Sequence, residues 1–393
     1  MKLGLCVRYD CNNYGSMLQI FATQKLITMY GWEYEHIRYD KKTLGFMVKN
    51  VTRLFNPYFM RGKVMGLMKK VKLKQHPEVM QKNQARDALF AEYRKKYILP
   101  YSPVYKGYDQ LVKGAEQYDA VMVGSDQLWT PAGVKSRFYN LLFVPEHIPK
   151  IAFATSFGVN QIPESQYAIT KEYLSRIEHI SVREIQGAKI IKHLTGRTSL
   201  VALDPTLMFS GAEWETFFPT ERKFNKPYIF AYFLGKNPDH REAVKRLAAQ
   251  KELMIVTCPH LDEYVESDDN FGDKQCFRVS PIDFLNLIRG AEYIYTDSFH
   301  GSVFSILNHK QFLTFNRFSE TEKQSRNSRI DSLFSLLGLE ARRCTKFSGN
   351  LEQQSDAPID YESVDKRLDI LRKKSFAFLE NALNSVGGEH HAR

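Results

Sequence analysis

The stretch Tyr295-Thr296-Asp297-Ser298-Phe299-His300-Gly301-Ser302 follows an apolar run that predicts a β-strand and opens a segment that predicts an α-helix. A helix N-terminus carries unpaired N–H groups and the positive end of the helix dipole, so this turn suits a phosphate or a carboxylate. Ser298 and Ser302 add hydroxyl groups, and Gly301 allows a ligand to approach the backbone. His300 can exchange a proton near neutral pH. We interpret the turn as the anion-binding and proton-handling centre of an enzyme, with a capping or core role for His300 as the simpler alternative.

Alternating strands and helices extend from this turn in both directions along the chain. In the N-terminal half, short apolar runs predict strands at residues 3–8, 33–39, 120–123, 151–155, 179–182 and 200–203. In the C-terminal half, the same signal predicts strands at residues 228–233, 253–257, 292–296 and 311–315. Helical patterns separate many of these strands, as in α/β folds with parallel sheets. We therefore predict an α/β fold of two Rossmann-like, doubly wound domains that face each other across a cleft.

The stretch from Asp204 to Asn225 contains two prolines and one glycine and predicts the linker between the domains. We expect the N-terminal domain to span residues 1–210 and the C-terminal domain to span residues 222–350. Residues 351–393 are expected to form a C-terminal helix and a polar tail. No group of His, Cys, Asp and Glu has the spacing of a metal site, so we predict no metal.

Composition limits the class of protein. A hydrophobic content of 43% with 13% aromatic residues indicates an ordered globular chain. The five cysteines have no paired spacing, which is typical of reduced thiols in a cytosolic protein. No apolar run approaches the roughly 18–20 residues that a membrane-spanning helix needs, and the first residues do not resemble a secretory signal. We therefore expect a cytoplasmic protein.

The net charge of +11 is concentrated in one part of the chain, a basic excursion at residues 41–110. Residues 41–77 contain ten Lys or Arg and no Asp or Glu, interleaved with Leu, Phe and Met. This mixture favours contact with an anionic membrane, which would make the protein peripheral at the inner face of the cell membrane. A solvated basic surface beside a negatively charged substrate is the main alternative. No nucleic-acid-binding motif accompanies the charge, so we expect no nucleic-acid partner.

Short blocks around the predicted loops occur in a fixed order along the chain. They are Asn13-Tyr14-Gly15, Gly124-Ser125-Asp126-Gln127-Leu128-Trp129, Ser156-Phe157-Gly158, Ser181-Val182-Arg183-Glu184, Leu203-Asp204-Pro205-Thr206 and Asp297-Ser298-Phe299-His300-Gly301. In this order, from about residue 5 to about residue 340, the chain resembles the polysaccharide pyruvyl transferase family. The resemblance implies a glycosyltransferase-B-like fold. It also implies transfer of the enolpyruvyl group of phosphoenolpyruvate, as a cyclic ketal, onto a sugar of a bacterial surface polysaccharide or its lipid-linked precursor, with release of phosphate.

The chemistry of that reaction gives each candidate residue a role. The donor, phosphoenolpyruvate, is a co-substrate and no cofactor is implied; its carboxylate and phosphate need several cationic or N–H groups. We expect His300 and Asp126 to be catalytic, with His300 either the general acid or a donor to phosphate. The predicted donor-binding residues are Arg183, which lies in the N-terminal domain, and six residues of the C-terminal domain, the expected donor side: Ser298, Gly301, Ser302, Arg317, Lys323 and Arg329. On the acceptor side, in the N-terminal domain, the predicted binding residues are Asn13, Tyr14, Gly15, Ser125, Gln127, Ser156, Phe157 and Gly158.

Simpler structural roles compete with several of these assignments. Arg183 and Glu184 could form a surface ion pair, Asp126 could cap a turn, and Asp204-Pro205 predicts a structural turn. At the level of function, two alternatives remain open. One is a nucleotide-sugar-dependent glycosyltransferase of the same two-domain architecture, and the other is a non-catalytic basic protein that binds anionic glycan or lipid.

Overall fold

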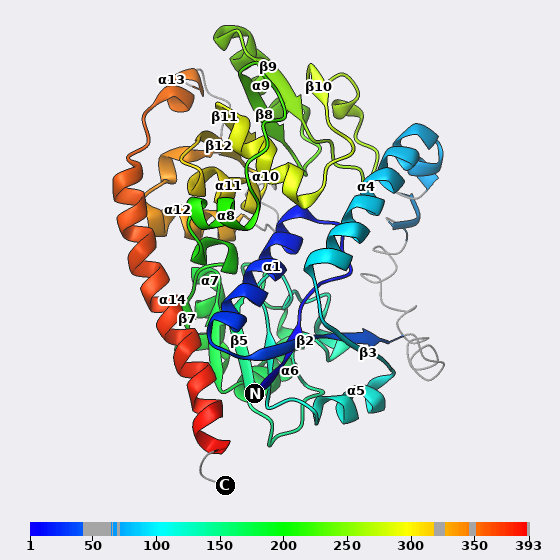
Figure 1. The fold of residues 1–393 in the computed structure, drawn as a ribbon, viewed down its shortest axis with the longest axis vertical. Coiled ribbons are helices and arrows are strands. Elements are labelled where there is room, and N and C mark those ends of the chain that lie inside the picture. The colour runs from blue at the N-terminus through cyan, green and yellow to red at the C-terminus, as the bar shows by residue number, and fades with distance from the viewer. Residues whose placement is uncertain (42–63, 65, 69–70, 318–326, 346–350, 391–393) are drawn as a thin grey trace.

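The computed structural model describes residues 1–41, 64, 66–68, 71–317, 327–345 and 351–390. Two parallel β-sheets organise it, one from each half of the chain (Figure 1). Predicted donor residue Lys323 and most of the basic segment 41–63 lie outside the described residues.

The first sheet has the strand order β3-β2-β1-β4-β5-β6-β7. Its strands are β1 (Lys2–Cys6), β2 (Glu33–Asp40), β3 (Tyr101–Lys106), β4 (Ala120–Val123), β5 (Lys150–Thr155), β6 (His179–Val182) and β7 (Leu200–Val201). Its helices are α1 (Tyr14–Met29), α4 (Pro77–Tyr97), α5 (Tyr108–Ala115), α6 (Tyr167–Ser175) and α7 (Ile185–Thr195), with short 3₁₀ turns η2 (Val134–Ser136), η3 (Glu164–Gln166) and η4 (Pro205–Met208). The strand order reverses between β1 and β4, which is where doubly wound sheets bind ligands.

The second sheet repeats the pattern with the order β10-β9-β8-β11-β12-β13. Its strands are β8 (Tyr228–Tyr232), β9 (Met254–Thr257), β10 (Lys274–Gln275), β11 (Tyr293–Thr296), β12 (Gln311–Phe315) and β13 (Arg343–Cys344). The helices of this half are α8 (Gly211–Phe217), α9 (Pro238–Lys251), α10 (Pro281–Gly290), α11 (Phe299–Leu307), α12 (Ser328–Leu337), α13 (Leu351–Asp356) and α14 (Tyr361–His390), with η5 (Glu266–Asp268) and η6 (Glu340–Arg342). The switch point of this sheet lies between β8 and β11.

The two halves pack against each other through aromatic side chains. Tyr14, in the first turn of α1, stacks on Phe284 of α10 with a centroid separation of 4.8 Å and lies 5.9 Å from the ring of Tyr232. The Tyr14 hydroxyl also lies 3.3 Å from Cys258 Sγ. These contacts hold the N-terminus of α1 close to the carboxyl edge of the second sheet.

Helix α14 leads the end of the chain from the second half back to the first (Figure 1). Ser375 Oγ accepts a hydrogen bond from the backbone N of Leu203 at 3.0 Å. Arg372 Nε donates to the carbonyl of Leu207 at 2.8 Å. The helix thus crosses from one half to the other and fastens the turn that follows β7.

Most strands form where the sequence predicts them, and two segments do not follow the prediction. The basic excursion is in part ordinary scaffold, because residues 77–97 form α4 and residues 101–106 form the edge strand β3. The predicted linker is not a plain connection, since it contains η4 and α8, and α8 is held by a capping box between Ser210 and Glu213. Both sheets fall within the expected domain ranges, whose boundaries stay a prediction.

Within the described part of the chain, no helix combines the length and the apolar character that a bilayer crossing requires.

Candidate active site

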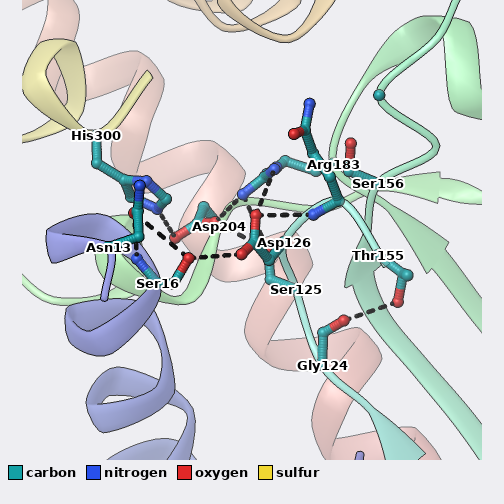
Figure 2. Close-up of polar contacts among 12 residues, drawn as sticks. Asn13, Ser16, Gly124, Ser125, Asp126, Thr155, Ser156, Arg183, Asp204 and His300 are labelled. Carbon is teal, nitrogen blue, oxygen red and sulfur yellow. Dashed lines mark hydrogen bonds and ion pairs between the residues drawn. The ribbon is translucent and has the colours of Figure 1, made fainter. Parts of the chain in front are cut away.

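Loops at the carboxyl edge of the first sheet supply most of the polar side chains of the site. Asn13 caps α1, and its Oδ1 accepts a hydrogen bond from the backbone N of Ser16 at 3.0 Å. Ser125 and Asp126 follow β4, Arg183 follows β6 and Asp204 follows β7. Figure 2 shows that these side chains converge on one point.

Asp126 occupies an unusual backbone conformation with φ of 88°, a region that few residues other than glycine adopt. The conformation directs its carboxylate toward α1, where Ser16 Oγ donates a hydrogen bond to Oδ2 at 2.6 Å. Burial opposes ionisation, but the Arg183 guanidinium and the Ser16 hydroxyl outweigh it and hold the pKa of Asp126 below its usual value. Asp126 is therefore an anchored carboxylate that stays ionised near neutral pH.

Asp204 is the fully buried carboxylate at the centre of the cluster. Its Oδ2 accepts hydrogen bonds from Arg183 Nη1 at 2.6 Å and from Ser125 Oγ at 2.8 Å. Its Oδ1 accepts from the backbone N of Thr206 at 3.0 Å and from Thr206 Oγ1 at 2.6 Å. Burial disfavours the charge, yet His300 and Arg183 hold the pKa of Asp204 well below its usual range.

His300 joins the cluster from the second half of the chain (Figure 2). Its Nε2 lies 3.7 Å from Asp204 Oδ1. The ring rests directly on the backbone of Gly15, where an added Cβ would lie only 2.0 Å from Nδ1. Gly15 therefore makes room for the imidazole. Gly15 is predicted to bind the acceptor, and in the structure it contacts His300.

Arg183 and Arg329 lie over the same aromatic ring. The guanidinium carbon of Arg183 is 4.6 Å from the centroid of Phe299, and that of Arg329 is 5.6 Å from it. With the amide oxygen of Gln127 turned toward Arg329, that oxygen accepts from Nη2 at 3.0 Å and from Nε at 3.1 Å. Burial and the neighbouring guanidinium groups of Arg183 and Arg317 lower the pKa of Arg329. Buried guanidinium groups that repel each other are typical of an anion-binding site, because a bound anion neutralises the repulsion.

Arg317 is a further basic side chain, and it lies at the rim of the cluster. Its Nη2 donates to the carbonyl of Asp297 at 3.0 Å. The Asp297 carboxylate accepts from the backbone N of Leu234 and of Gly235 at 2.8 and 2.7 Å, which ties the turn after β11 to the loop after β8. The side chains of Arg317, Asp126 and His300 are 21, 15 and 9% exposed, whereas those of Arg183 and Asp204 are 1 and 0% exposed. Solvent therefore reaches the first three side chains.

The structure does not bring every predicted donor residue to this cluster. Ser298 caps α11 and accepts from the backbone N of Gly301 at 3.3 Å. Gly301 packs on β11, where a Cβ would meet Thr296 Oγ1 at 2.7 Å. Ser302 is fully buried and bonds to the Ser298 carbonyl and to Thr314 Oγ1. These three residues hold the His300 turn in place.

Several predicted acceptor residues also have structural contacts. Ser156 and Phe157 are fully buried, and a single oxygen of Glu184 accepts from Ser156 Oγ and from the backbone N of Phe157 and of Gly158. The simpler alternative of a surface ion pair between Arg183 and Glu184 is wrong, because both side chains are buried and bind different partners. Tyr14 serves the packing between the two halves described above.

Sequence reasoning missed four members of the site, namely Ser16, Glu184, Asp204 and Phe299. Glu184, Asp204 and Phe299 have a signal, because all three lie within the ordered blocks quoted from the sequence, but the simpler roles of Glu184 and Asp204, an ion pair and a turn, compete with it. In the described residues, no group of three or more His, Cys, Asp or Glu side chains is arranged to hold a metal ion.

Comparison with known proteins adds a family and a fold. The family model described as polysaccharide pyruvyl transferase matches residues 13–319. No curated protein matches the chain at a significant level.

Among solved structures, a "putative UDP-N-acetylglucosamine 2-epimerase" from Listeria monocytogenes is similar with a TM-score of 0.50 and 9% identity, covering 95% of this chain and 90% of that one. A UDP-GlcNAc 2-epimerase from Neisseria meningitidis gives a TM-score of 0.48 and 11% identity, covering 95% and 99%. At these identities the first likeness shows the fold alone. The predicted α/β fold of glycosyltransferase-B type, with two doubly wound parallel sheets, is confirmed.

Proposed function

The chain belongs to the polysaccharide pyruvyl transferase family, and on that premise we propose that it moves the enolpyruvyl group of phosphoenolpyruvate onto a sugar as a cyclic ketal. The acceptor in this proposal is a bacterial surface polysaccharide or its lipid-linked precursor. Phosphate is the second product. No cofactor or metal takes part in the proposed reaction.

The observation that carries the proposal is the meeting of Arg183, Arg317 and Arg329 beside His300. Phosphoenolpyruvate carries a carboxylate and a phosphate on three carbons, so it needs several cations close together. Burial, and after it repulsion from the guanidinium groups of Arg183 and Arg317, lowers the pKa of Arg329, and an anion that binds between the guanidinium groups relieves the repulsion. Guanidinium groups also bind phosphate and carboxylate through paired N–H donors.

The reaction needs one proton delivered and two removed. In the first step, His300 gives a proton to C3 of the enol while the first sugar hydroxyl attacks C2, and that hydroxyl loses its proton to Asp126. The bond from C2 to the phosphate oxygen then breaks, and phosphate leaves toward the arginines. A second hydroxyl attacks C2, closes the ring and gives its proton to the deprotonated His300, while the departing phosphate takes the proton that Asp126 received.

The lowered pKa of Asp126 fits its proposed role as the acceptor of the proton from the first sugar hydroxyl. An ionised carboxylate of low basicity does not abstract a proton from a neutral alcohol efficiently, but it accepts one from an oxygen that already bonds to an electron-poor carbon. Asp204 has a positioning role in the proposal, because it contacts both Arg183 and His300 and is closed to solvent.

Thermal-shift titration and product analysis test the proposal. Phosphoenolpyruvate should raise the melting temperature, and UDP-sugars should not. Mass spectrometry with a panel of lipid-linked galactosyl, glucosyl and N-acetylmannosaminyl acceptors should detect a pyruvyl ketal. His300→Ala should abolish transfer, and Arg183→Ala should chiefly weaken donor binding. Stabilisation by UDP-sugars alone would instead support the nucleotide-sugar glycosyltransferase, and near-normal turnover of His300→Ala would remove the catalytic assignment.

A further inference from the structure

An exposed apolar face precedes helix α4. Residues 64, 66–68 and 71–74 are helical, and four large apolar side chains in this stretch face solvent. Val64, Leu67, Met68 and Val71 are 49, 64, 66 and 50% exposed. Their spacing of three, four and seven residues is that of one side of a helix. We call these four residues the apolar face; contiguous exposed apolar side chains of this kind mark an interaction site.

Among the described residues, the contacts of this segment lie on its other side and leave the apolar face exposed. Tyr264, from the loop after β9, stacks on the ring of His76 at a centroid separation of 3.5 Å. Lys72 Nζ lies 5.0 Å from the centroid of the same tyrosine ring. Leu73 is half-buried on this inner side. Tyr264 therefore anchors the segment in an orientation that presents the apolar face outward, at the end of α4 and on the side of the molecule away from α14 (Figure 1).

The charge next to the apolar face identifies its partner as an anion. Lys72 and Lys74 are exposed beside it, and the sequence from residue 41 to residue 77 contains ten Lys or Arg and no acidic residue. A bilayer interface offers anionic headgroups above an apolar layer, which matches basic and aliphatic side chains on one helix. Nucleic acid offers phosphate without an apolar layer, and its bases stack on aromatic rings rather than on Val, Leu or Met.

We propose that the described residues 64, 66–68 and 71–74 dock the protein on the surface of an anionic membrane, with the apolar face in the headgroup zone and Lys72 and Lys74 among the lipid phosphates. The inference does not depend on the reaction proposed above. It goes beyond that reaction because it places the protein at a membrane surface.

Helix α4 connects this docking surface to the candidate site. Arg86 of α4 pairs with Asp262 at 2.6 Å, in the loop that carries Tyr264. Toward the other end of α4, Arg94 donates to Asn12 Oδ1 at 2.7 Å, directly beside the Asn13 cap. A membrane-docked protein would thus hold the loop before α1 at a set orientation to the bilayer, which suits an acceptor carried by a lipid.

Co-sedimentation of the full chain with vesicles tests the proposal. The vesicles contain phosphatidylcholine alone or with phosphatidylglycerol. Leu67→Ser/Met68→Ser/Val71→Ser should weaken binding to anionic vesicles on the order of 100-fold. Lys72→Gln/Lys74→Gln should weaken it by about five-fold per lysine and reduce its salt dependence. Ile370→Ser, which changes a residue 54% exposed on α14, is the matched control and should bind as the unchanged protein does.

The outcomes separate the membrane from other partners. Absence of the unchanged protein from the anionic-vesicle pellet, or equal sedimentation of the apolar variant, overturns the proposal. Tighter binding to single-stranded RNA or duplex DNA that depends on the lysines and not on the apolar face also overturns it, in favour of nucleic acid. Melting temperatures within about 2 °C of the unchanged protein show that the variants remain folded. All variants should bind phosphoenolpyruvate equally well. Failure of the membrane proposal can therefore be distinguished from failure of the proposed reaction.

Discussion

Gly15 is the residue whose replacement tests the geometry of the site most directly. In the first turn of α1, an alanine Cβ at this position would lie 2.0 Å from His300 Nδ1 and 2.2 Å from its Cγ. Gly15 is not among the glycines with positive φ, so alanine fits the backbone and the conflict is with the imidazole. Because comfortable contacts of a Cβ begin near 3.4 Å, the ring or the helix must shift by roughly 1.4 Å.

This displacement should affect catalysis far more than stability. Alanine favours the helix by up to about 1 kcal/mol relative to glycine, and forcing a methyl group into a packed site costs about 1–3 kcal/mol. The free energy of unfolding should therefore fall by about 2 kcal/mol or less. A misplacement of about 1 Å in a catalytic group lowers turnover on the order of 100-fold, so we expect at least that loss for Gly15→Ala.

The assay is phosphate release from phosphoenolpyruvate with the acceptor found by product analysis, accompanied by urea unfolding. Gly133→Ala is the matched control, because its backbone φ is −92° and the nearest atom to an added Cβ is 3.5 Å away. We expect the control to keep its turnover. If Gly15→Ala keeps more than half of the turnover, the position of His300 does not depend on this contact and the reasoning is refuted.

Two further predictions concern the buried charges. Asp204→Asn should lower the free energy of unfolding by about 3–5 kcal/mol at pH 7, because it leaves Arg183 without its closest carboxylate. Because the pKa of Asp204 is lowered in the folded state, its contribution to stability is complete above the unfolded pKa near pH 4 and is lost as the pH falls through the folded pKa. In urea unfolding from pH 7 to pH 3, the free energies of unfolding of the variant and of the unchanged protein should therefore converge. A constant difference between the two free energies would contradict this. Arg329→Met should keep or raise the melting temperature without ligand, because it removes a buried charge repelled by Arg183 and Arg317, and it should reduce the shift caused by phosphoenolpyruvate. A strongly lowered melting temperature with an intact ligand shift would contradict that prediction.

The sequence predicts the buried strands better than the surface elements. β4 and β6 have the predicted limits. β4 is a continuous apolar run, as is typical of a strand covered on both faces, whereas His179 and Ser181 interrupt the apolar residues of β6. β3 is an edge strand with a proline at position 103, so its pattern is weak. α4 escapes prediction because only three of its residues are buried, Arg86, Phe90 and Tyr93, among many charged ones.

The site shows a different limit. Residue types at loop positions predict that His300, Asp126 and Arg183 lie near a ligand, because the carboxyl ends of parallel strands meet at one edge. They do not show which polar atoms bind each other. Ser125 and Asp204 are 79 residues apart in the chain yet lie 2.8 Å apart at their oxygens. A side chain in a strand-end loop can either face the ligand or support a neighbouring residue. Ser302 does the second, because its hydroxyl lies within hydrogen-bond distance of Thr314 Oγ1.

Support from neighbouring residues also explains how a site of buried charges can exist before its ligand arrives. Asp204 engages Arg183 and approaches His300, and Asp297 Oδ1 lies 3.4 Å from Arg317 Nη2, so these three groups each have a fixed acidic neighbour. Arg329 instead receives an amide and an aromatic ring from the described residues, and the two nearby guanidinium groups act on it more strongly than the acidic side chains do. An anionic ligand relieves that repulsion and so gains binding free energy from it, whereas a neutral ligand does not. Stability and donor affinity should therefore oppose each other at Arg329, whereas both should fall together at Asp204.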